Sequence, residues 1–410
     1  MSSRPAARRT PAVNRTQQTG QLSSTAVTTP AAAHKRARPN AQGPSPPPPP
    51  PGQDGDGDDD DDDEDQPDPD AQPGEKRKIV DPESSKNHPL NRPGRHFGRT
   101  VEAFGRFLPV LEFGIYAEDE ASQGNPLADV DMSDEERKWD FEYKMLALLV
   151  PDLREWINEI GVKMVAIYLT NARKNARGED AKKVKDHLHA MRAWTPTLVG
   201  LPKDQRGMRH DEIAGLIAPP HDRADVMSDD PIKRQATRML YIHRQRHLDP
   251  ELWPAFLYHN FKIYPHNVWR GLLKSNILVV TAQMLLHGPR ALTPGAPIGG
   301  RSNAVLNDMS EMTIPTICYA ATLLYFALSS DTEFQPVPAP GGFAYKAFYD
   351  GLKQHIESQP DERRQALLAW WNARVFTQGQ NVVATRPAGV KTTAELLAEQ
   401  GVQADDDVLE

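Results

Sequence analysis

The contrast between the first 100 residues and the rest of the chain most constrains how this protein can fold. These residues hold 17 of the 37 prolines and none of the 7 tryptophans or 10 tyrosines. Such a segment offers too little apolar surface to offset the entropy lost on folding. We therefore predict a disordered Pro-rich and Asp-rich tail over 1–92, a helical domain over 93–380 and a C-terminal tail with a short helix over 381–410.

The N-terminal tail is segregated by charge. Residues 1–53 carry seven Lys and Arg side chains and no carboxylate, whereas residues 54–70 carry twelve carboxylates. Like charges at this density repel one another, so we expect the acidic run to stay extended. We interpret it either as a solvated linker or as a contact for a basic protein. The unbroken proline run at 46–51 favours polyproline II structure, which we interpret either as a stiff spacer or as a ligand of the SH3 or WW type.

Two short basic clusters in the tail are candidates for a nuclear import signal. Their members are Lys35, Arg36, Arg38, Lys76, Arg77 and Lys78. The chain has one cysteine, which excludes an intramolecular disulfide and fits a reducing compartment. No apolar run follows the N-terminal methionine, so we expect no secretory signal. We therefore expect an intracellular protein, nuclear or cytoplasmic.

Beyond residue 95, apolar residues recur at steps of three and four, which predicts helices. Ser133 and Glu136 form a capping-box pattern, and Thr313 precedes a helix with Pro315 in its first turn. The predicted helices span 97–111, 139–150, 153–160, 164–172, 184–191, 231–246, 267–288, 314–328, 345–357 and 362–376. Because strand patterns are scarce, the predicted fold class is mainly α, an irregular multi-helix domain with long loops.

The most apolar of these helices do not favour a membrane. Their apolar runs are about 14–15 residues long, whereas a helix needs about 20 apolar residues to cross a bilayer. Polar residues such as Thr281 and Thr322 also interrupt the runs. We therefore predict buried central helices and no membrane partner.

Sequence signatures of catalysis are scarce. No Gly-x-Ser-x-Gly turn, P-loop or dinucleotide-binding glycine motif occurs. Cys318 lies in an apolar helix, where a thiol is expected to be buried and inert. No set of His, Cys, Asp and Glu residues has clear metal-ligand spacing, so we predict no metal and no cofactor. An enzyme of unknown class is the alternative hypothesis, with its site on the loops around His210, His221 and Arg301.

One helical stretch stands out by its charge. Between Lys163 and Arg192 there are eight basic residues and three acidic ones. Spacings of three and four bring side chains onto one helix surface. A solvated surface is one interpretation of this stretch, and phosphate binding is the other. The residues that we predict to contact nucleic acid, if it is bound, are Arg173, Lys174, Arg177, Lys182, Lys183 and Lys185.

Several motifs in the C-terminal half form a recognisable series. They are Asp249-x-x-x-Trp253-Pro254-x-Phe256-Leu257-Tyr258, Trp269-Arg-Gly-Leu-Leu-Lys-Ser275, Phe326-Ala-Leu-Ser-Ser330, Phe348-Tyr349 and Trp370-Trp371-Asn372. Over about residues 97–376 the chain resembles an uncharacterised family of domains of unknown function that is expanded in mushroom-forming fungi. It departs from the family pattern at 206–219. The resemblance implies a fungal, intracellular setting and no mechanism.

These observations predict an intracellular, mainly α-helical interaction domain behind a disordered, charged tail. We expect it to be non-catalytic. Its expected partners are another protein, or nucleic acid through the basic stretch.

Overall fold

The computed structural model describes residues 87–293, 301–338 and 341–376. These residues belong to one compact unit of the chain, Arg77–Glu410. Most of the predicted N-terminal tail, both import-signal clusters and the predicted C-terminal helix lie outside the described residues.

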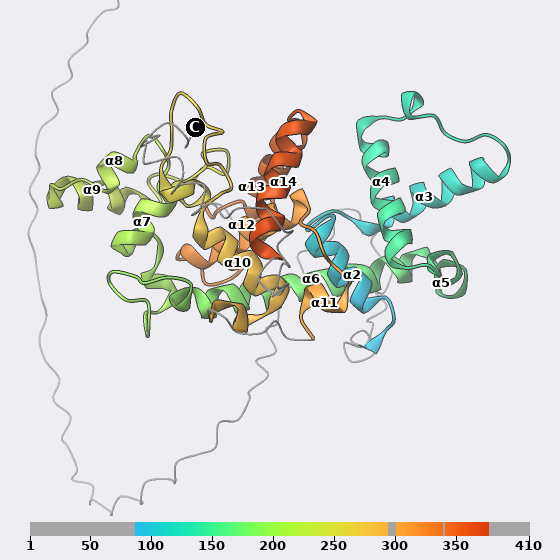
Figure 1. The fold of residues 1–410 in the computed structure, drawn as a ribbon, viewed down its shortest axis with the longest axis horizontal. Coiled ribbons are helices and arrows are strands. Elements are labelled where there is room, and N and C mark those ends of the chain that lie inside the picture. Colours follow the sequence, from blue (N-terminus) through green and yellow to red (C-terminus); the bar gives the residue numbers. More distant parts are fainter. Residues whose placement is uncertain (1–86, 294–300, 339–340, 377–410) are drawn as a thin grey trace, which may run out of the picture. The chain divides into compact units, whose positions relative to one another are not determined.

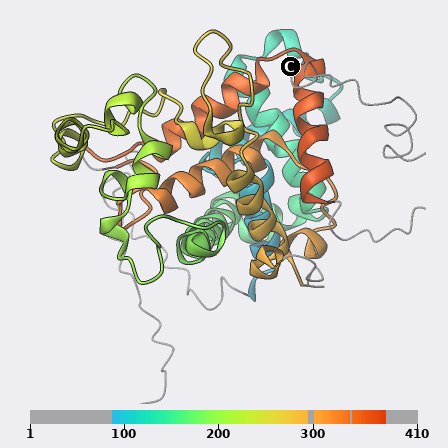
Figure 2. The same ribbon diagram turned by 60° about the vertical axis from the view of Figure 1, so that its left-hand side comes forward.

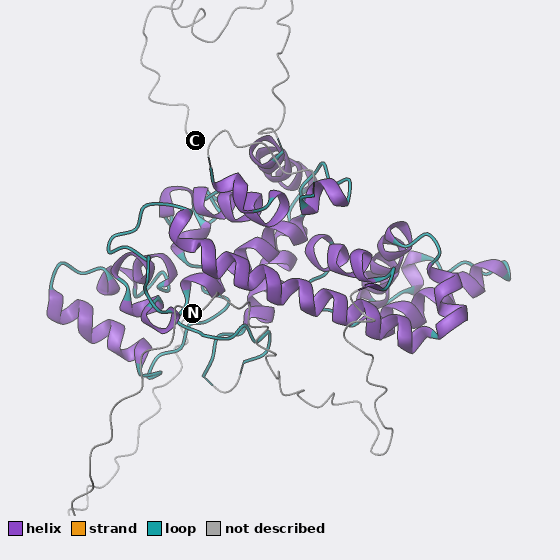
Figure 3. Ribbon diagram, turned by 90° about the horizontal axis from the view of Figure 1, so that it is seen from below, coloured by secondary structure: helices purple, strands orange, loops and turns teal. Residues whose placement is uncertain are grey.

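The described part of the chain is mainly α, as predicted, with long loops between its helices (Figure 3). Its thirteen α-helices include several short ones, and no strand occurs among the described residues apart from one isolated bridge between Tyr258 and Leu272. None of the helices in these ranges is both long and apolar enough to cross a membrane.

The first helices form a small core of their own. They are α2 (Asn91–Thr100), α3 (Phe107–Ser122), α4 (Asp134–Leu149) and α5 (Leu153–Ile160). Their buried apolar residues cluster with those of the first half of α6 (Val162–His187). Helix α2 packs closely on α6 because Gly98 has no side chain: a Cβ there would stand 2.5 Å from Arg173 Cγ.

A larger core is built around two apolar helices, α10 (Asn276–His287) and α12 (Ile314–Leu328). Figure 1 shows them between the α3–α5 group and the α7–α9 group. The surrounding helices are α7 (Asp211–Ile217), α8 (Arg223–Val226), α9 (Pro231–Ile242), α11 (Asn303–Leu306), α13 (Tyr345–Glu357) and α14 (Asp361–Val375). Helices α7–α9 project to one side of this core (Figure 2).

Local capping signals placed several helices correctly. The Ser133 hydroxyl accepts from Glu136 N while Glu136 accepts from Ser133 N, which confirms the capping box at the start of α4. Thr313 caps α12 by accepting from Thr316 N. Helix α13 has the predicted bounds, and α14 lies within one residue of them at each end.

Other predicted helices were wrong. The single helix predicted over 97–111 is two helices, α2 and α3, joined by a loop over 101–106. The stretches 164–172 and 184–191 mostly belong to one continuous helix, α6. Helix α10 begins at Asn276 rather than near Asn267, because the Ser275 hydroxyl caps it by accepting from Leu278 N. Helix α9 ends four residues earlier than predicted.

Candidate functional site

A cavity of about 420 Å³ lies where the C-terminal end of α9 meets two loops. One loop precedes α7 and contributes Met208 and Arg209, and the other follows α12 and runs to Tyr345. This volume lies in the range of natural ligand sites. The lining residues are mostly polar, however, which suits a segment of another protein better than an apolar small molecule.

The end of α9 brings Arg244 into this cavity. Arg244 has a left-handed backbone, with φ of 56°. Its N–H donates to Tyr241 O at 3.1 Å, and the next N–H, of Gln245, donates to Leu240 O at 2.8 Å. These two bonds define a Schellman motif, in which the left-handed position is usually glycine. Helix α9 therefore ends with an arginine where backbone geometry favours glycine.

The charged residues of the cavity come from three segments. Residues 244–247 contribute Arg244, Arg246 and His247, residues 331–333 contribute Asp331 and Glu333, and the loop before α7 contributes Asp204 and Arg209. Two of these charges already have partners, because Arg246 bonds to Asp222 and Asp331 accepts from Tyr345 OH at 2.5 Å. The cavity is thus not uniformly positive, and its available cations gather at the end of α9.

A half-buried lysine caps the C-terminal end of α12. Lys203 Nζ donates to Phe326 O at 2.6 Å and also to Ser329 O. Burial lowers the pKa of Lys203 to about 7. A cation at a helix C-terminus is stabilising because the last carbonyls are unpaired. We therefore assign Lys203 a structural role, in which it holds the loop after α12 in place.

Helix α9 buries several polar residues and leaves several apolar residues exposed. Thr237, Arg238 and Tyr241 are buried. Arg238 Nε donates to Val226 O at 3.0 Å, and Tyr241 OH donates to Asp222. On the other side, Ile232 is 79% exposed and Met239 is 37% exposed. An ordinary surface helix buries its apolar stripe, whereas α9 leaves Ile232 and Met239 exposed, together with Lys233 and Gln235.

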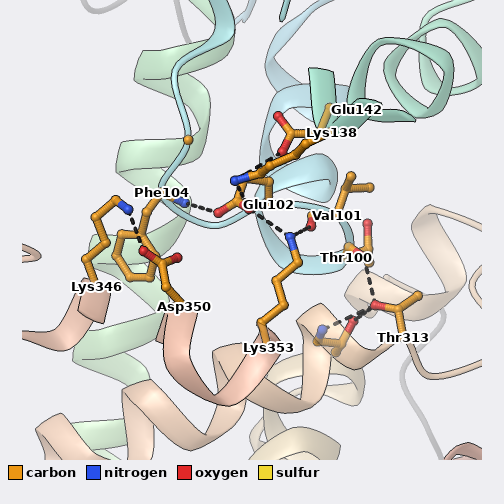
Figure 4. A network of polar contacts seen from close by, with 12 residues as sticks. Thr100, Val101, Glu102, Phe104, Lys138, Glu142, Thr313, Lys346, Asp350 and Lys353 are labelled. Atoms are coloured by element: carbon orange, nitrogen blue, oxygen red, sulfur yellow. Dashed lines mark hydrogen bonds and ion pairs between the residues drawn. The ribbon is translucent and has the colours of Figure 1, made fainter. Parts of the chain in front are cut away.

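A second group of polar residues joins the two cores (Figure 4). We call Glu102, Lys138, Glu142 and Lys353 the polar junction. Glu102 accepts from Lys353 Nζ at 2.8 Å and lies 3.4 Å from Lys138 Nζ. Burial alone raises the pKa of Glu102, but the charges of Lys353 and Lys138 outweigh it and lower that pKa to about 2. Glu102 is therefore a buried, ionised partner for the lysines.

Glu142 is the opposite case within the same junction. It is 3% exposed, and its Oε1 has no hydrogen-bond partner. Lys138 Nζ stands 3.7 Å from that oxygen. Burial and then the neighbouring Glu102 charge raise the pKa of Glu142 to about 7. The pKa values of Glu102 and Glu142 therefore differ widely, although both carboxylates lie near the same lysines.

Two of the predicted nucleic-acid contacts hold the loop over 101–106 instead of lying on an open surface. Arg173 is 6% exposed, and its guanidinium donates to Glu102 O and Gly105 O and lies 4.4 Å from the Phe107 ring centroid. Arg177 donates to Ala103 O at 2.9 Å. A loop without regular structure needs such partners for its carbonyls.

The other four predicted contacts, which we call the α6 lysines, are Lys174, Lys182, Lys183 and Lys185. Lys174 and Lys182 are exposed, and Lys183 and Lys185 are half-buried. Lys183 lies 3.5 Å from the buried Asp180 carboxylate. The structure therefore divides the six predicted contacts into two arginines that hold the loop and four lysines that are exposed or half-buried.

The three residues of the enzyme hypothesis are not brought together. His210 is buried and caps α7: its Nδ1 accepts from Ile213 N, and its Nε2 bonds to Pro196 O at 2.8 Å. His221 lies beside Asp222, and Arg301 is exposed in another loop. Within the described ranges, no hydrogen bond, ion pair or ring contact joins any two of the three.

Cys318 is fully buried in α12, and burial raises the pKa of its thiol far above the usual range. The described residues include no group of three or more His, Cys, Asp and Glu side chains placed to hold a metal ion.

A protein-family model matches residues 171–376, half of the chain. It describes a family of unknown function, DUF6698. The chain belongs to DUF6698. Comparisons with curated proteins and with solved structures gave no match. The resemblance to a family of unknown function is thus confirmed over this range.

The DUF6698 region contains the cavity and all of α9. It contains only part of the polar junction, because Lys353 lies inside the matched range while Glu102, Lys138 and Glu142 precede it. We therefore take the exposed face of α9 (Ile232, Ala236 and Met239) and the cavity as the candidate site, because both lie within the DUF6698 region.

Sequence reasoning missed Arg244 and the exposed face of α9. Periodicity indicated a helix here, but it does not say which face meets the core. A local signal was present for charge, since residues 231–247 contain five Lys and Arg residues and no acidic one.

Proposed function

We propose that this protein is a non-catalytic helical interaction domain that binds a segment of a protein partner on the α9 surface. We define the α9 surface as Ile232, Ala236 and Met239, the exposed apolar residues of α9; the cavity lies at the C-terminal end of the same helix. The observation that carries the proposal is that α9 buries and bonds Arg238 and Tyr241 while it leaves Ile232, Ala236 and Met239 exposed.

The spacing of the exposed residues suits a helical partner. Ile232, Ala236 and Met239 are separated by four and three positions, so they form one stripe along α9. Met227, which is 44% exposed, lies just before this helix. Stripes with this spacing pack against an amphipathic helix in many protein complexes.

Charge indicates the chemistry of the partner. Residues 231–247 contain five Lys and Arg residues and no carboxylate. Three of the five are paired with Asp225, Asp211 and Asp222, so Arg234 and Arg244 are the cations of this segment without an ion-pair partner among the described residues. Two copies of this surface would bring like charges together, which disfavours self-association. A segment whose apolar residues are flanked by Asp or Glu is complementary both to the stripe and to its cationic surroundings. We therefore propose an acidic amphipathic segment as the occupant.

The non-catalytic part of the proposal rests on the positions of the reactive candidates. His210 has both ring nitrogens engaged in holding backbone, and Cys318 is buried with a raised thiol pKa. Lys203 is held by carbonyl oxygens at a helix end. Each therefore has a structural role.

Affinity purification of the native full-length protein, with and without nuclease, tests the proposal when it is combined with surface variants. The test variant is Ile232→Glu with Met239→Glu. The matched control is Phe141→Glu with Leu148→Glu on α4, where the side chains are 56% and 75% exposed. We expect partner proteins to survive nuclease and the control substitutions and to be lost from the α9 variant. Retention by the α9 variant, or equal loss from both variants, contradicts the proposal.

Nucleic acid is the second candidate partner, and the α6 lysines are the observation that favours it, because they lie within twelve residues of one helix. Partners released by nuclease in the same purification would favour this candidate. Nuclear import through the two basic clusters of the tail is also a proposal. Imaging the full-length protein after substitution of Lys76, Arg77 and Lys78 tests its second cluster.

A further inference from the structure

We propose that Arg244 and His247 form a carboxylate-binding site at the mouth of the cavity, which receives an Asp or Glu side chain of the partner segment. The inference deepens the proposed function and rests on it, because it assigns one residue pair to one chemical group of the partner. It depends on the backbone of Arg244, on the convergence of the two side chains and on the neighbouring charges.

The backbone at Arg244 is the first observation. A left-handed conformation is disfavoured for any residue with a Cβ, and a Schellman motif normally places glycine there. Arg244 adopts φ of 56° although glycine would close α9 with the same two hydrogen bonds. Disfavoured backbone conformations of this kind are enriched at functional sites. The arginine side chain, rather than the turn, is therefore the feature that needs an explanation.

The two side chains converge on Gly341. A Cβ on Gly341 would stand 3.5 Å from His247 Cε1 and 3.6 Å from Arg244 Cδ. Both side chains are exposed and line the cavity. Within the described part of the chain, neither has a hydrogen-bond or ion-pair partner. A cation and an imidazole thus lie together with donor groups available for a ligand.

The remaining charges favour a carboxylate over a phosphate. Arg246 already bonds to Asp222, and Arg209 donates to Asp204 O at 3.2 Å. Three carboxylates, of Asp204, Asp331 and Glu333, line the same cavity. They outnumber the one arginine of the cavity that has no partner within the described ranges, so the second negative charge of a phosphate would meet net repulsion. An arginine beside an imidazole suffices to bind one carboxylate through charge-assisted hydrogen bonds.

Fluorescence anisotropy with the full-length protein and labelled synthetic peptides tests the site. The carboxylate probe is an 18-residue helical peptide with a stripe of Leu on a background of Glu. A second probe has Gln in place of Glu, and a third has phosphoserine at half of the Glu positions. The protein variants are Arg244→Gly and the control Lys163→Gln, which removes one exposed α6 cation that does not line the cavity.

We expect Arg244→Gly to weaken binding of the Glu probe about tenfold, as expected for the loss of one charge-assisted contact. Arg244→Gly should change binding of the Gln probe little, and Lys163→Gln should change binding of the Glu probe little. No binding of the Glu probe to the wild type, or an equal loss in both variants, overturns the site. Tighter binding of the phosphoserine probe overturns the carboxylate assignment.

A different variant tests the proposed function independently of the Arg244 site. Ile232→Glu with Met239→Glu should weaken the Glu and Gln probes alike, because both probes carry the Leu stripe. An effect of Arg244→Gly without any effect of this double variant would leave the anion site standing and refute the α9 surface.

Urea unfolding distinguishes a binding role of Arg244 from a structural role. Arg244→Gly relieves the left-handed strain, so the variant should unfold at a higher urea concentration than the wild type. A variant that both weakens binding and loses stability would show that Arg244 holds the turn, and it would overturn the argument.

Discussion

Replacing Glu142 by Gln should stabilise the protein at alkaline pH and leave it nearly unchanged at acidic pH. The pKa of Glu142 is about 7 in the folded protein against an ordinary value of 4.5, and burial is the main cause. The folded state holds this proton more tightly than the unfolded state does. The contribution of Glu142 to the free energy of unfolding is therefore fully present below pH 4.5 and is lost as pH rises towards 7. Above pH 7 the ionised Glu142 lowers the free energy of unfolding by about 3 kcal/mol.

The measurement is urea unfolding of wild type and Glu142→Gln at pH 5 and pH 8. We expect the variant to gain about 2.5 kcal/mol on the wild type between these two pH values. Other groups with shifted pKa values, such as His96, titrate in both proteins and cancel in the difference.

Glu102 provides a matched control with the opposite sign. Lys353 and Lys138 hold its pKa at about 2, so its contribution is present above pH 4.5 and is lost as pH falls towards 2. Glu102→Gln leaves the half-buried Lys353 without its carboxylate and should destabilise the protein by about 3 kcal/mol at pH 8. If Glu142→Gln is also destabilising at pH 8, Glu142 is a favourable partner of Lys138, and our assignment of the junction is refuted.

Three further predictions follow from buried and exposed side chains. Cys318 should resist a thiol reagent in the folded protein and react fully in urea, because it is buried with a raised thiol pKa. Arg173→Ala should destabilise the protein by about 2–4 kcal/mol in urea unfolding, whereas Lys182→Ala should change stability by less than about 0.5 kcal/mol. If the α6 lysines neutralise four phosphates of duplex DNA, binding titrations should give a log–log salt slope of about −3.6, and charge reversal at Lys182 and Lys185 should flatten it.

Local signals explain which parts of the fold could be predicted. The capping box at Ser133 and the cap at Thr313 involve residues three apart, so the sequence contains everything that the structure uses there. The loop over 101–106 is different, because its carbonyl oxygens are satisfied by Arg173 and Arg177, about 70 residues away. Those arginines resembled a surface patch since spacing along one helix does not reveal what packs on it.

The candidate site was hidden for the same reason. The sequence pattern 231–246 correctly indicated a helix, but the side of α9 that is buried depends on Asp211 and Asp222, which bind Arg238 and Tyr241 from outside the helix. The early end of α9 at a left-handed Arg244 also lacked a signal, because glycine is the residue that marks such an end.

The DUF6698 region is matched from residue 171, which lies inside α6. Helix α6 contributes its first half to the smaller core and its second half to the larger one, so this boundary does not separate two structural units. Arg173 and Lys353 lie within the matched region, yet both bond to the loop over 101–106. A fragment limited to 171–376 would leave these two cations without their partners and would expose the face of α6 that α2 covers. The α9 surface therefore belongs to the matched region, but the scaffold that supports it includes the helices that precede that region.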